Sequence, residues 1–114
     1  MDQHEMELIP LFDEIEKYAG IWPSEEVLDN TIKLGSMLKP QLKEFSDGKF
    51  RSDRNETLGF FEAIEKFRET NLPIDLDFFR SLVKKYRKRI MPYPHYSGIK
   101  LKVPSDLSNM DSFN

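Results

Sequence analysis

The sequence predicts an all-α fold, a compact bundle-like domain of four or five helices followed by an extended C-terminal arm. Between the seven prolines, apolar residues recur at intervals of three and four, the spacing of a helix with one buried face. Residues that cap helices stand where those stretches begin. The 114 residues are 39% hydrophobic and include nine Phe, enough for the core of one domain without a disulfide or a metal.

The first helix is expected over residues 9–19, with Pro10 in its opening turn and Gly20 as its stop. The second begins after Ser24, whose hydroxyl can accept from a free N–H of the first turn. Its end is open, because Pro40 removes a helical donor while the apolar period continues beyond it. We expect either a kink or a new short helix near Pro40. The buried stripe of the first helix comprises Leu8, Leu11, Phe12, Ile15, Tyr18 and Ala19.

The third helix is expected to follow a charged connection over residues 49–55, with Asp53 in a capping-box pattern, and to end near Thr70. Asp75 is expected to cap the fourth helix, which Met91 and the proline after it terminate. The expected core positions of these two helices are Leu58, Phe61, Ile64, Phe67, Phe79, Leu82, Val83, Tyr86 and Ile90. Two further phenylalanines, Phe60 and Phe78, fall outside these stripes and either widen the core or form an apolar patch.

Residues 92–114 differ in character from the helical domain expected over residues 1–91. The segment begins with closely spaced prolines, which favour an extended chain. Over residues 99–103 apolar and basic side chains alternate, which is the period of a strand. A lone strand needs a backbone partner, so we expect this one to pair with another part of the chain or with the exposed edge of another protein.

Charge is unevenly distributed along the chain. Residues 1–30 carry nine acidic side chains and one basic side chain, whereas residues 78–105 carry eight basic side chains and no acidic one. The net charge of −3 therefore hides two opposed fields. Such fields can steer a charged partner or hold the two ends of the chain together.

The sequence favours a non-enzymatic protein that binds another protein, such as a small inhibitor, an immunity-type or antitoxin-type protein, or a subunit of a complex. In the fourth helix four basic residues, Arg80, Lys84, Arg87 and Lys88, share the face opposite the apolar stripe. The expected binding residues are Arg80, Lys84, Arg87 and Lys88 for steering, Tyr93 and Tyr96 for anchoring, and Ile99, Leu101 and Val103 for strand pairing. The alternative is a nucleic-acid-binding accessory protein that contacts phosphates through the same helix. Association with a second copy of the chain is a further alternative.

Other classes of function find no support in the residue pattern. The chain has no Cys, no Gly-rich phosphate loop and no nucleophile beside a base, so we expect no catalytic residues, no cofactor and no metal. Glu62, Glu65 and Glu69 lack the histidines of a di-metal site and are expected to pair along their own helix with Lys66 and Arg68. No apolar run suits a membrane span, and we expect a cytoplasmic protein.

Overall fold

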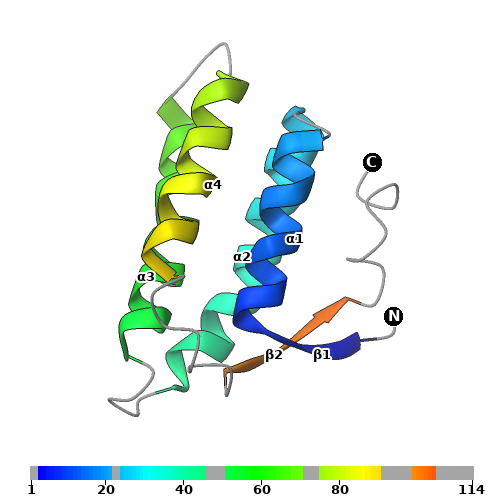
Figure 1. Ribbon diagram of the computed structural model, residues 1–114, viewed down its shortest axis with the longest axis vertical. Helices are drawn as coiled ribbons and strands as arrows, with labels where there is room; N and C mark the ends of the chain where they lie inside the picture. The colour runs from blue at the N-terminus through cyan, green and yellow to red at the C-terminus, as the bar shows by residue number, and fades with distance from the viewer. Residues whose placement is uncertain (1–2, 22–23, 46–50, 71–74, 91–98, 105–114) are drawn as a thin grey trace.

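The computed structural model describes residues 3–21, 24–45, 51–70, 75–90 and 99–104. Its elements are β1 (Gln3–Glu7), α1 (Leu8–Ile21), α2 (Glu25–Lys43), α3 (Arg51–Thr70), α4 (Leu76–Ile90) and β2 (Lys100–Pro104). The four helices run up and down along the long axis, and the two strands cross one end of the bundle (Figure 1). Each helix packs against two others, so that the bundle closes around one core. The predicted helical bundle is confirmed, with a small sheet added to it.

Helix α1 buries the stripe that its sequence predicts. All six residues of that stripe are at most 4% exposed. Pro10 lies in the first turn, where the missing N–H would have had no helical partner. The helix runs two residues past the expected end, through Gly20 to Ile21.

Helix α2 confirms one expectation and corrects another. The hydroxyl of Ser24 accepts a hydrogen bond of 3.2 Å from the Val27 N–H, as its capping role requires. Pro40, however, lies inside a helix that continues to Lys43, and no new helix begins there. Residues on both sides of Pro40 are fully buried, among them Leu42, and this packing holds the backbone helical despite the lost donor.

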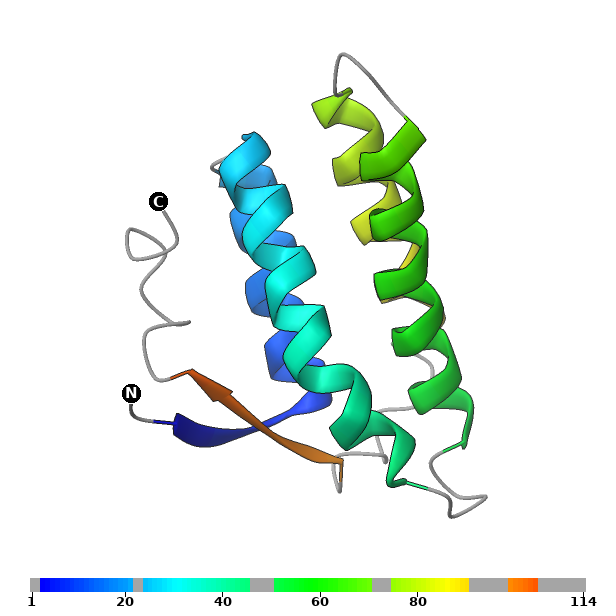
Figure 2. The ribbon, with the colours of Figure 1, turned by 180° about the vertical axis from the view of Figure 1, so that it is seen from behind.

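Helix α3 begins at Arg51, so that it includes most of the expected connection. Phe60 is fully buried because α3 faces two neighbouring helices and needs a wider apolar face than one stripe. Its ring centroid lies 4.9 Å from that of Phe12 and 5.8 Å from that of Tyr86. Figure 2 shows the molecule from behind, with α3 between its neighbours α2 and α4. Phe60 therefore belongs to the core.

Helix α4 begins as its sequence predicts. The Asp75 carboxylate accepts hydrogen bonds from the N–H groups of Asp77 and Phe78, at 3.0 and 3.1 Å. The side chain of Phe78 is 49% exposed and its ring packs on that of Phe67, with centroids 5.0 Å apart. The helix ends at Ile90, which is buried.

The strand expected near the end of the chain pairs with the first described residues. β2 lies antiparallel to β1, with Met6 opposite Leu101 and Glu5 opposite Lys102. The side chains of Ile99, Leu101 and Val103 are fully buried in the core. The strand therefore packs on its own bundle, and over residues 99–104 the expected separate arm is part of the helical body.

The outer edge of β2 is occupied by a side chain of α2. The Gln41 amide donates to the Lys102 carbonyl at 3.0 Å and accepts from the Lys102 N–H at 2.8 Å. A side-chain amide presents the same donor and acceptor as a peptide group, so it satisfies this edge as a third strand would. At Lys102, the strand edge expected to meet another protein is therefore already occupied.

Candidate interaction surface

The charged residues of α4 point in three directions because the helix buries one side. Phe79, Leu82, Val83 and Ile90 face the core. At 100° per residue, Arg80 and Arg87 then flank the core on the side of α1, and Arg89 flanks it on the side of α3. The remaining cations turn outward. They are Lys84, Lys85 and Lys88, all exposed.

On the α1 side, Arg87 is neutralised by two carboxylates. Its Nε and Nη2 atoms lie 2.7 and 2.6 Å from Oδ1 of Asp13. Its Nε also lies 3.0 Å from Oε2 of Glu16, which accepts no hydrogen bond from the described residues, so this second contact is electrostatic. Carboxylates of α1 thus compensate the charge of one cation of α4 directly.

The other two arginines also have partners within the chain. Arg80 donates from Nε to the Ala19 carbonyl at 3.4 Å and from Nη1 to Asp77 at 3.3 Å. Both contacts are long, and the Asp77 side chain is 89% exposed, so they restrain Arg80 weakly. Arg89 donates to Glu56 at 3.4 Å and lies over the Tyr86 ring, 5.0 Å from its centroid.

The three outward lysines have no carboxylate within ion-pair distance among the described residues. Lys85 lies 5.9 Å from the centroid of the Tyr86 ring, which carries no net charge. The structure thus brings the four predicted steering residues onto one helix but divides them by role. Arg87 is held by α1 and Arg80 is loosely held, whereas Lys84 and Lys88 remain uncompensated.

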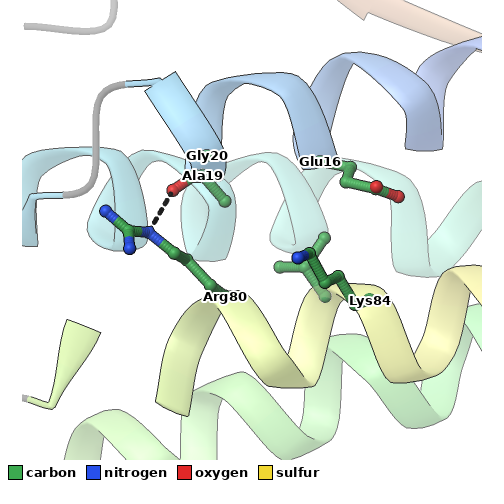
Figure 3. A pocket seen from close by; sticks show the side chains of 6 residues that line it. Glu16, Ala19, Gly20, Arg80 and Lys84 are labelled. Carbon is green, nitrogen blue, oxygen red and sulfur yellow. Dashed lines mark hydrogen bonds between the residues drawn. The ribbon is translucent and has the colours of Figure 1, made fainter. Parts of the chain in front are cut away.

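A groove follows the junction of α1 and α4 beside these lysines. One hollow of about 240 Å³ is lined by Glu16, Ala19, Gly20, Arg80, Val83 and Lys84. A second, more open hollow of about 460 Å³ shares three of these residues and adds Asp13, Lys17 and Arg87. In Figure 3, Lys84 lies between Arg80 and Glu16, and the Glu16 carboxylate is turned away from Arg80. Arg80 and Lys84 therefore border the same space.

The other predicted binding residues fall into two groups. Tyr93 and Tyr96 lie outside the described residues. The side chains of Ile99, Leu101 and Val103 are buried, so the binding role expected of them is not carried forward.

Sequence reasoning missed Lys85 and the α1 side of the groove. Lys85 could have been found from the helical period alone, which places it one turn from Ser81 on the outward face. The opposed charges of the two ends of the chain indicated that α1 and α4 can attract each other, but they did not indicate which residues would meet.

Two charged residues of α3 form ion pairs with α2. Glu65 pairs with Lys39 of α2, and Arg68 donates to Asp29 of α2 at 2.9 Å. The expected pairing along α3 is therefore wrong for Glu65 and Arg68. The described side chains include no cluster of three or more potential metal ligands.

Neither the described helices nor comparison with known proteins indicates a functional class for the chain. None of the helices in the described ranges combines the length and apolar character that crossing a membrane requires. Comparison with protein-family models, with curated proteins and with solved structures finds no match.

Proposed function

We propose that the protein is a non-enzymatic interaction module, of the inhibitor, immunity or complex-subunit kind, that binds an acidic surface of another protein through α4. The observation that carries the proposal is the uncompensated set Lys84, Lys85 and Lys88 on the outward face of the helix. Three like charges on neighbouring turns repel one another, and an acidic partner relieves that repulsion. The same charges raise the rate of encounter with such a partner.

A protein partner fits this surface better than a nucleic acid. The chain carries a net charge of −3, and Asp13 and Glu16 stand close to the cations of α4. These carboxylates repel the continuous row of phosphates that a nucleic acid presents. A protein surface can place its acidic groups opposite the lysines and keep them away from α1.

Charge reversal on α4 tests the proposal. The double variant Lys85→Glu, Lys88→Glu is compared with wild type as immobilised bait, and the double variant Lys33→Glu, Lys66→Glu is the matched control. Lys33 and Lys66 are exposed on α2 and α3, so the control changes the net charge equally on other faces. We expect proteins captured by wild type and control to be lost from the α4 variant and to dissociate as salt rises.

Two results would contradict the proposal. One is capture of the same proteins by all three baits. The other is binding of a fluorescent oligonucleotide at about 50 mM salt that the α4 variant loses and the control keeps, which would favour the nucleic-acid alternative.

A further inference from the structure

The groove between α1 and α4 is positively charged although α1 is acidic. Its lining contains four cations, Lys17, Arg80, Lys84 and Arg87, and two carboxylates. Both carboxylates contact Arg87. The four cations and two carboxylates leave the lining with a net charge of +2, and an anion is the ligand that balances it.

The surroundings of the groove favour a single negative charge over a phosphate. Asp13 and Glu16 stand at one end and repel a dianion more strongly than a monoanion. The carbonyl end of α1, where Ala19 accepts from Arg80, carries the negative end of the helix dipole and acts in the same sense. A carboxylate can use the donors of Arg80 and Lys84 with the smaller repulsion.

The size and walls of the groove suit a side chain better than a whole small molecule. The less open of the two hollows, which is the one that Arg80 lines, has a volume of about 240 Å³ and is below the roughly 300 Å³ at which drug-sized sites begin. Ala19 and Val83 supply apolar wall between the charged groups. In an aspartate or glutamate side chain, one or two methylenes precede the carboxylate. The methylenes can contact the apolar wall while the carboxylate contacts the basic groups.

We propose that this groove receives a carboxylate side chain from an acidic segment of a protein partner, held between Arg80 and Lys84. The inference rests on the proposed function and specifies where on this protein one acidic residue of the partner binds. The lysines at 85 and 88 steer the partner, and the groove fixes one of its acidic residues. Lys84 belongs to both surfaces, but Lys85 and Lys88 do not line the groove, and Gly20 and Arg80 are not among the outward lysines, so the two roles can be tested separately.

Gly20 allows the groove to be filled without altering its charge. A Cβ built on Gly20 meets nothing within 4 Å, and the residue lines both hollows. The variant Gly20→Leu therefore occupies the space and leaves Arg80 and Lys84 in place. Ser36→Leu, which adds the same side chain at an exposed position of α2, is the matched control. Arg80→Gln removes a groove cation, and Lys66→Gln is its control for net charge.

The probe is an oligoglutamate peptide of about eight residues, titrated into isotopically labelled protein and followed by NMR. We expect shifts at the Gly20 amide and at the Arg80 Nε–H. We also expect about fivefold or greater weakening in Gly20→Leu and in Arg80→Gln, and little change in the two controls.

Each remaining outcome points to one of the two proposals. Unchanged peptide affinity in Gly20→Leu, with loss in Lys85→Glu, Lys88→Glu, overturns the groove and leaves the proposed function standing. Unchanged affinity in the α4 double variant, with loss in Gly20→Leu, overturns the steering role. If oligothymidylate of the same length shifts Arg80 and Gly20 at lower concentration than the peptide does, the choice of a carboxylate is wrong.

Discussion

Replacing Gly35 by alanine tests a close approach of α2 to α3. An alanine Cβ there would lie 2.5 Å from Cδ1 and 2.8 Å from Cγ of the Phe61 ring, well inside van der Waals contact. Phe61 is 1% exposed and its ring centroid lies 5.1 Å from that of Phe60, so it has little room to move away. Overpacking of this kind costs about 1–3 kcal/mol, and the steep overlap places this case in the upper part of that range.

The better helix propensity of alanine returns about 1 kcal/mol, so we expect the free energy of unfolding to fall by about 1–2 kcal/mol. Urea denaturation followed by far-ultraviolet circular dichroism measures it. Gly59→Ala is the control, because its Cβ would meet Tyr86 at an ordinary 3.5 Å, and we expect a gain of about 0.5–1 kcal/mol. Equal or greater stability of Gly35→Ala would refute the close packing. Phe61→Leu combined with Gly35→Ala should cost less than the two single changes added together.

Two further predictions concern the contacts that close the fold. Arg87→Gln loses both of its carboxylate contacts and should lower the free energy of unfolding by about 1 kcal/mol in urea denaturation, less at high salt, whereas Lys88→Gln should change it little. If both variants lowered the free energy of unfolding equally, the contacts of Arg87 with α1 would not stabilise the fold. Gln41→Ala frees the Lys102 N–H, so its amide hydrogen exchange should accelerate by about fivefold or more, while the Leu101 amide, which faces β1, keeps its protection. Unchanged exchange at Lys102 would mean that Gln41 does not cover the strand.

The helices were predictable because their signals are local. Ser24 and Asp75 act as caps through their own neighbouring N–H groups, and the stripe of α1 follows from the helical period alone. The helical character of residues 51–55 was missed because a charged segment looks like a connection until the helix is seen to continue through it. Pro40 misled for a related reason, since burial of its neighbours outweighs the local cost of a proline.

Strand β1 was missed because its inward side chains give a weak signal. His4 and Met6 lie opposite the buried Val103 and Leu101, and Met6 packs against the core. With only one apolar residue in Gln3–Glu7, the segment reads as polar coil without its partner strand. The alternating residues of β2 were recognised, but the identity of the partner strand was not. Pairing of segments from opposite ends of the chain is set by the three-dimensional fold and leaves no local period in either segment.

The sequence by itself determined the four described helices, the caps at Ser24 and Asp75, most of the apolar faces and the concentration of cations on α4, because each depends on residues within a few positions of one another. The cap expected at Asp53 is wrong, since this residue lies inside α3. Only the tertiary structure decided which of those cations remain available. The charge of Arg87 is compensated by Asp13 and Glu16 because α1 packs against α4, whereas the charge of Lys84 is not compensated by an ion pair within the described residues. Charge is fixed by residue type, but its compensation depends on which distant groups the packing of the core brings within a few ångströms.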